Sequence, residues 1–125
     1  MNKFATSINC IDGRVQIPII EYIKNKYQVD YVDMLTQPGV NKLFADRKDI
    51  LILEAIKKSV EISVNRYNSK LIAIIGHYDC AGNPVNKEEH IKQIKLAIEF
   101  VNEWHPNVKV IGLWVNESWQ IEEIG

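Results

Sequence analysis

The sequence has no long hydrophobic run, no excess of either charge and no apolar segment near its amino terminus. Its most continuous apolar stretch, residues 71–76, is far shorter than the roughly 20 residues that cross a bilayer, so no membrane span is expected. The 15 basic and 16 acidic residues leave a formal net charge of -1, and no basic stripe is interleaved with aromatic residues. A nucleic-acid partner is therefore not expected. Without a secretory signal, the expected location is the cytoplasm.

Cysteine is also scarce, since only Cys10 and Cys80 occur. In a reducing compartment, an isolated pair is more often metal-binding, catalytic or simply buried than joined in a disulfide. The chain has no internal repeat, no low-complexity segment and no linker rich in proline, glycine or serine. With 46% hydrophobic and 25% charged residues, it has the composition of a globular protein, and residues 1–125 are predicted to form a single domain.

Strand and helix patterns alternate along the chain, which predicts an α/β fold. Strands are expected over 3–10, 29–35, 71–76 and 108–115, with a short edge strand over 119–124. Helices are expected over 15–27, 50–67 and 87–104, and residues 39–49 are expected to form a loop. Such an order predicts three layers: a mostly parallel sheet of about four strands plus the edge strand, with helices on both faces.

Hydrophobic spacing also predicts which helix faces are buried. In the first helix, Ile17, Ile20 and Ile23 recur at helical spacing, and in the second the apolar stripe starts at Ile50. Between the first strand and the first helix, Gly13 is expected to adopt a positive φ in a turn.

Cysteine and histidine side chains follow two of the predicted strands. Cys10 comes directly after the first strand, while His77 and Cys80 follow the third. In open parallel sheets, ligands bind beyond the carboxyl ends of strands, where neighbouring connections leave toward opposite faces. If the first and third strands are neighbours there, these three side chains converge.

Two thiolates and an imidazole form a ligand set that suits zinc, and three protein ligands leave a coordination position for water. Asp12 is expected either to fill that position or to accept a hydrogen bond from the water. Arg14 is placed to hold Asp12 through a bidentate ion pair. Spacing alone leaves simpler readings open: the cysteines as small buried residues, His77 as a core or capping histidine, and Asp12 with Arg14 as an ion pair that stabilises a turn.

Other polar and aromatic residues are assigned structural roles. Asp79 is expected to cap a turn or to accept a hydrogen bond near the metal ligands. His90 and His105 are expected on helix surfaces or helix ends, away from the metal. The three tryptophans are expected to pack in the core or at an interface: Trp104, Trp114 and Trp119.

The paired motifs resemble those of the beta-class carbonic anhydrases. That family carries Cys-x-Asp-x-Arg after one strand, here Cys10 to Arg14, and Gly-His-x-x-Cys after another, here Gly76 to Cys80. The resemblance implies a zinc lyase that interconverts carbon dioxide and bicarbonate and assembles as a homodimer or higher homo-oligomer. It also implies zinc ligation by Cys10, His77 and Cys80, with Asp12 and Arg14 as the catalytic dyad.

The sequence departs from the family pattern at several points. Gly13 stands where the family usually has serine, Cys80 is followed by Ala81-Gly82, and residues 36–40 lack the usual Arg-x-Ala-Gly-Asn segment. The chain is also short for this family. Three alternatives therefore stay open: a zinc-binding relative without activity, a hydrolase of carbonyl sulfide or carbon disulfide, and a thiol redox protein that uses Cys10 and Cys80.

Overall fold

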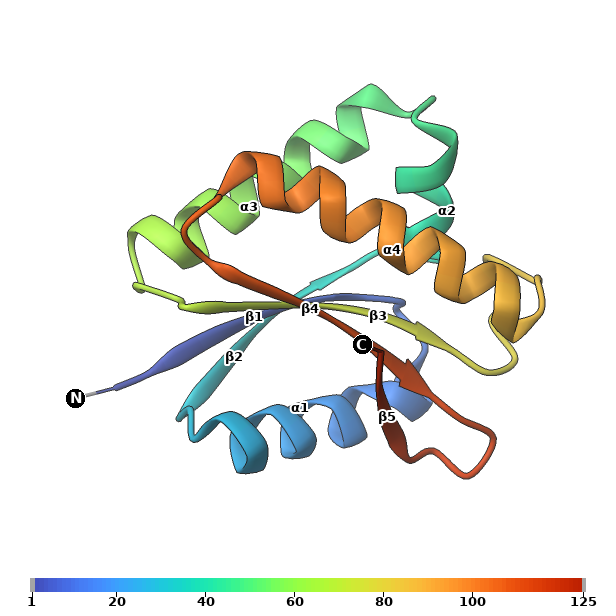
Figure 1. The fold of residues 1–125 in the computed structure, drawn as a ribbon, viewed down its shortest axis with the longest axis horizontal. Helices are drawn as coiled ribbons and strands as arrows, with labels where there is room; N and C mark the ends of the chain where they lie inside the picture. The colour runs from blue at the N-terminus through green and yellow to red at the C-terminus, as the bar shows by residue number, and fades with distance from the viewer. Residues whose placement is uncertain (1, 125) are drawn as a thin grey trace.

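A five-stranded sheet with the order β2-β1-β3-β4-β5 forms the centre of the protein. The structure is a computed structural model that describes residues 2–124. Strands β1 to β4 are parallel, and β5 pairs with β4 in the antiparallel direction (Figure 1). The strands are β1 (Phe4–Asn9), β2 (Tyr31–Thr36), β3 (Leu71–His77), β4 (Lys109–Val115) and β5 (Ile121–Ile124). The predicted edge strand is thus confirmed.

Helices cover both faces of this sheet. They are α1 (Gly13–Tyr27), α2 (Val40–Asp46), α3 (Ile50–Asn65) and α4 (Lys87–Trp104). Figure 1 shows α1 alone on one face and the other three helices on the opposite face. This arrangement confirms the predicted three-layer α/β fold with a mostly parallel sheet. In the described part of the chain, no helix is long and apolar enough to cross a membrane.

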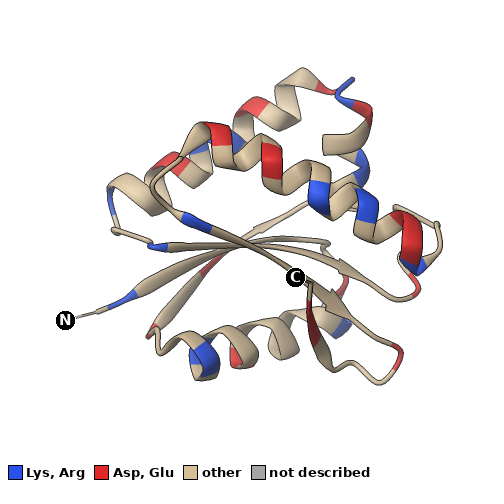
Figure 2. Ribbon diagram, in the orientation of Figure 1, with Lys and Arg blue, Asp and Glu red and all other residues tan. Residues whose placement is uncertain are grey.

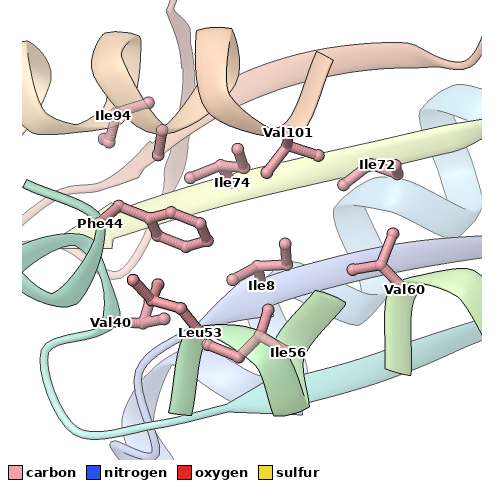
Figure 3. Close-up of a cluster of buried hydrophobic side chains, with 11 residues drawn as sticks. Ile8, Val40, Phe44, Leu53, Ile56, Val60, Ile72, Ile74, Ile94 and Val101 are labelled. Atoms are coloured by element: carbon pink, nitrogen blue, oxygen red, sulfur yellow. The ribbon is translucent and has the colours of Figure 1, made fainter. Parts of the chain in front are cut away.

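The central strand β3 is buried along its whole length, as expected for a strand with helices above and below it. On the three-helix face, Ile8 of β1 lies beside Ile74 of β3 and packs against Phe44 and Val60 (Figure 3). On the other face, a second cluster joins the sheet to α1 through Val15, which is fully buried. These two cores hold β1 and β3 side by side.

The connections diverge where β1 and β3 end. From β1 the chain crosses to β2 through α1 on one face, whereas from β3 it crosses to β4 through α4 on the opposite face. The carboxyl ends of β1 and β3 therefore flank the switch point at which open α/β sheets bind ligands.

One helix was not predicted, and residues 39–49 were expected to form a loop. The structure instead has the seven-residue helix α2 within that segment. It buries Val40, Asn41 and Phe44 and begins directly after Gly39, whose backbone is left-handed. With only two turns, the helix is too short to produce a clear hydrophobic period, and this explains the error.

The buried faces of two helices also differ from prediction. Helix α1 buries Val15, Ile19 and Ile23, while Ile17 is 65% exposed. In α3 the buried set starts at Leu53 rather than at Ile50. The expectation for Gly13 is wrong as well: it is the first residue of α1, with Asp12 as the capping residue, and its φ is not positive.

A carboxylate of β5 ties the edge strand to α1. Glu123 accepts hydrogen bonds from the hydroxyls of Tyr22 and Tyr27, each at 2.6 Å, and from the Lys26 ammonium. Lys26 and the two tyrosines lower the pKa of Glu123 to about 2. In the folded protein the charged form of this carboxyl group is therefore favoured.

Replacing this carboxylate should weaken the fold in a pH-dependent way. Because the folded pKa of Glu123 lies below an unfolded value of about 4.3, its contribution is complete above that pH and is lost as the pH falls toward 2. We expect Glu123→Gln to lower the free energy of unfolding by about 1 kcal/mol at pH 7, a value that allows for partial solvent exposure. Urea unfolding at pH 7, 4 and 3 should show this difference shrinking. Glu99→Gln, an exposed residue outside every ion pair of residues 2–124, should show no such trend.

Candidate metal centre

Three side chains meet at the switch point. Cys10 follows β1 directly, His77 is the last residue of β3, and Cys80 lies in the loop after it. One ligand atom from each lies within 4.8 Å of those of the other two, and all three residues are buried. The convergence expected from the sequence is thus present, because β1 and β3 are neighbours in the sheet.

The hydrogen bond of His77 leaves one ring nitrogen free for a ligand. Its Nδ1 lies 2.7 Å from the carbonyl oxygen of Tyr78, which can only accept, so Nδ1 carries the proton in the neutral ring. Nε2 is buried and has no hydrogen-bond partner among the described residues. A ring oriented by donating one N–H to a backbone carbonyl, with the lone pair of its other nitrogen free, is the usual arrangement of a metal-binding histidine.

The sulfur positions fit a tetrahedral metal ion. The Sγ atoms of Cys10 and Cys80 lie 3.9 Å apart, and both cysteines are free. Two zinc–sulfur bonds of about 2.3 Å at a tetrahedral angle place the sulfurs about 3.8 Å apart, whereas a disulfide requires about 2.05 Å. The separation and the chemistry of the three donors therefore fit zinc.

Electrostatics favours one thiolate at this position. The hydrogen bond from Cys80 lowers the pKa of Cys10 well below that of a free thiol, while the same bond and burial raise the pKa of Cys80. Burial opposes the charged form of His77, but the nearby Cys10 thiolate and the Tyr78 carbonyl outweigh this effect and raise its pKa. The three groups thus share protons that a bound metal ion would displace.

Two loops meet beside Cys10 at a backbone contact between glycines. A Cβ atom on Gly39 would lie 2.4 Å from the carbonyl carbon and oxygen of Gly82, and Gly39 also has a φ of +54°. This close approach lets the Gly39 amide donate a hydrogen bond to the Cys10 sulfur over 3.5 Å. The contact therefore joins the loop before α2 to the loop that carries Cys80.

Asp12 and Arg14 form the ion pair expected from their spacing. The Arg14 Nη2 lies 2.6 Å from Asp12 Oδ2, Nε lies 3.0 Å from Oδ1, and the Arg14 backbone amide donates to Oδ1. These bonds lower the pKa of Asp12 to about 2. Asp12 is outside the group whose ligand atoms lie within 4.8 Å of one another, and both of its oxygens bind Arg14.

Arg14 is itself held from two further sides. Its Nη1 lies 3.2 Å from the Asp79 carboxylate, and its Nη2 donates to the Asp79 carbonyl oxygen. The guanidinium stacks over the ring of Trp119, 4.5 Å from the ring centroid. Asp79 and Trp119 both have left-handed backbones, with φ values of 57° and 58°. Such conformations are uncommon outside glycine and often occur at functional sites.

Sequence reasoning missed a polar cluster behind the metal group. His90 was expected on a helix surface, but it is buried on the inner side of α4. Its Nδ1 lies 3.4 Å from the Asn83 amide nitrogen, which donates to Gln93 Oε1 at 2.6 Å. Burial lowers the pKa of His90, which favours the neutral form of its ring. Helical spacing could have revealed this position, because His90 precedes the buried Ile94 by four residues.

The other histidine and two of the tryptophans singled out in the sequence lie at the end of α4 or on β4. His105 caps the carboxyl end of α4, as expected. Trp114 is buried against His90, and Trp104 packs on Phe44. A small cavity of about 10 Å³, close to the size of one water molecule, lies among the metal group, Asn41 and His90.

Comparisons with known proteins give a family match for the sequence and similar structures for the fold. A family model described as "Putative carbonic anhydrase" matches residues 1–125. The structure of a carbonic anhydrase from Streptococcus mutans is similar at 14% identity with a TM-score of 0.65, covering 99% of this chain and 83% of that one. A beta-carbonic anhydrase from Trichomonas vaginalis gives 16% identity, a TM-score of 0.64, and 99% and 85% coverage. A tetrameric beta-carbonic anhydrase from Sordaria macrospora is similar at 13% identity with a TM-score of 0.53, covering 99% of this chain and 81% of that one. The search of curated proteins gave no match.

Proposed function

Because the chain belongs to this carbonic anhydrase family, we propose that it catalyses the zinc-dependent, reversible hydration of carbon dioxide to bicarbonate. One observation carries the proposal: two buried sulfurs and a buried, unpartnered imidazole nitrogen converge at the switch point of the sheet. Cys10, His77 and Cys80 would hold the zinc ion. When bound, zinc would supply Lewis acidity, which lowers the pKa of a water molecule enough to make it a nucleophile near neutral pH.

Asp12 and Arg14 would orient the reacting molecules. Arg14 keeps Asp12 ionised and turned toward itself, so that the carboxylate stays available as a hydrogen-bond acceptor without a proton of its own. Asp79 and Trp119 would fix the guanidinium in that orientation. We infer that Asp12 accepts a hydrogen bond from the attacking water and that Arg14 positions Asp12.

The proposal includes assembly into a homodimer or a higher homo-oligomer. The Sordaria macrospora relative is described as tetrameric. In this chain, apolar side chains are exposed next to the candidate site: Ile11 is 56% exposed, Ile17 65% and Tyr78 47%. Exposed apolar groups around a site are suited to contact with a second chain. The cytoplasmic location stays a prediction from the sequence.

The experiment is a stopped-flow assay of carbon dioxide hydration on protein of measured metal content. We expect about one zinc per chain and a hydration rate well above the buffer background from neutral to mildly alkaline pH. A metal-loaded protein that stays at background would contradict the proposal and leave a zinc-binding role without this activity. Parallel assays with carbonyl sulfide and carbon disulfide would reveal a hydrolase of those substrates.

Arg14→Ala separates catalysis from metal binding. Since the side-chain hydrogen bonds of Arg14 among the described residues go to Asp12 and Asp79 and not to the metal ligands, we expect zinc content to be retained while the hydration rate falls by about 10- to 100-fold. Arg66→Ala, a change of the same kind at an exposed residue after α3, serves as the control and should leave the rate unchanged. An unaltered rate in the Arg14 variant would remove this residue from the mechanism.

A further inference from the structure

A second, much larger cavity lies at the opposite end of the sheet from the metal group. It is formed where β1, β3 and β4 begin, with the end of α1 beside it, whereas Cys10 and His77 lie where β1 and β3 end. Its volume of about 400 Å³ is within the range of small-molecule binding sites. The proposed hydration reaction does not use it.

Three lysines give this cavity a positive charge. Lys3, Lys70 and Lys109 line it, all three are exposed, and none of them forms an ion pair within residues 2–124. Figure 2 shows blue segments at the beginnings of these three strands, on one side of the molecule. The described residues that line the cavity include no acidic side chain. Asp30 lies nearby, where its carboxylate accepts the Lys3 backbone amide at 2.7 Å. In a chain with a net charge of -1, this concentration of cations favours an anionic ligand.

Aromatic rings form the wall between the lysines. Phe4 and Tyr67 stack with their centroids 4.7 Å apart and their planes within 9° of parallel. The Tyr27 ring also lines the cavity, 5.4 Å below the Lys109 ammonium. Tyr67 remains 46% exposed, so part of this aromatic wall is available to a ligand. Flat rings of this kind favour the stacking of a planar group such as a nucleobase.

We propose that this cavity binds a nucleoside phosphate, with the base against Tyr67 and the phosphate held by Lys70 and Lys109. Lysine ammonium groups are common ligands of phosphate, and the aromatic wall accounts for a planar ring on the same molecule. The assignment is independent of the proposed hydration activity, since the metal group lies at the other end of the strands.

The test is calorimetric titration of the full chain with ADP at fixed ionic strength, with adenosine and inorganic phosphate titrated separately. We expect saturable ADP binding that is tighter than binding of either part alone. Lys70→Glu/Lys109→Glu should weaken ADP binding by about tenfold or more while metal content stays unchanged. The control Lys92→Glu/Lys95→Glu makes the same change of charge on exposed positions of α4 and should bind ADP as the unaltered protein does.

A second variant tests the aromatic wall. Tyr67→Leu keeps an apolar side chain but removes the ring, so it should weaken ADP binding and leave the weak binding of phosphate unchanged. Thermal melting of each variant would verify that it is folded. The proposal is overturned if ADP does not bind at millimolar concentration, if both double-lysine variants lose binding equally, or if phosphate alone binds as tightly as ADP.

Discussion

Cys80→Ser is expected to abolish both metal binding and carbon dioxide hydration while the protein stays folded. Serine offers a hydroxyl, which is not ionised at neutral pH, in place of a thiol, so zinc would lose one of its three protein ligands. We expect zinc affinity to fall by more than about 100-fold, which is the upper end of the loss seen when only a hydrogen-bonded neighbour of a ligand is removed. Equilibrium dialysis against a zinc-buffered solution, together with the stopped-flow assay, measures both effects.

The neighbouring residue provides a matched control. Ala81→Ser places the same hydroxyl one position further along, on an exposed residue of the same loop. It should keep the metal and the activity, since the ligand atoms of Cys10, His77 and Cys80 remain in place. Full zinc content in the Cys80 variant would show that this sulfur is not a ligand, and the proposed metal centre would then be wrong.

Much of the fold could be predicted because its strongest signals are local. Residues 71–76 are apolar on both faces, a pattern that a strand covered by helices on both sides requires, and they form most of β3. The helix over residues 87–104 was also placed correctly, and its carboxyl end could be predicted because Pro106 follows it closely and prevents its continuation. Two features were not predicted correctly. Helix α2 is too short to show a hydrophobic period, and the buried face of α1 depends on the elements that it packs against.

The candidate metal ligands could be predicted because metal binding selects particular residue types, here cysteine and histidine. Two cysteines and a histidine at strand ends suit a metal, but their convergence was conditional on the first and third strands being neighbours, which only the structure shows. The roles of Trp119 and Asp79 could not be read in this way. Their contacts with Arg14 depend on left-handed backbones in two separate loops, and nothing in the residue types around them predicts that conformation.

Gly39→Ala is expected to be the most damaging substitution outside the metal ligands. Alanine would have to adopt a φ of +54°, and its Cβ would lie 2.4 Å from backbone atoms of Gly82, which no side-chain rotation can relieve. The left-handed backbone and the enforced separation of the two loops should together lower the free energy of unfolding by about 3 kcal/mol or more. Because the Gly39 amide donates to the Cys10 sulfur, zinc affinity should fall as well.

Gly13→Ala separates this effect from the general effect of adding a methyl group near the site. A Cβ on Gly13 meets nothing within 4 Å, and the residue lies in the first turn of α1, where alanine is favoured. Its unfolding free energy should therefore stay within about 1 kcal/mol of the original or rise slightly. Urea unfolding and zinc titration of both variants distinguish loss of the contact between Gly39 and Gly82 from a general effect of the added methyl group. Equal losses in both would mean that the contact between Gly39 and Gly82 does not hold the two loops, and that Cys10 is positioned by the β1 strand alone.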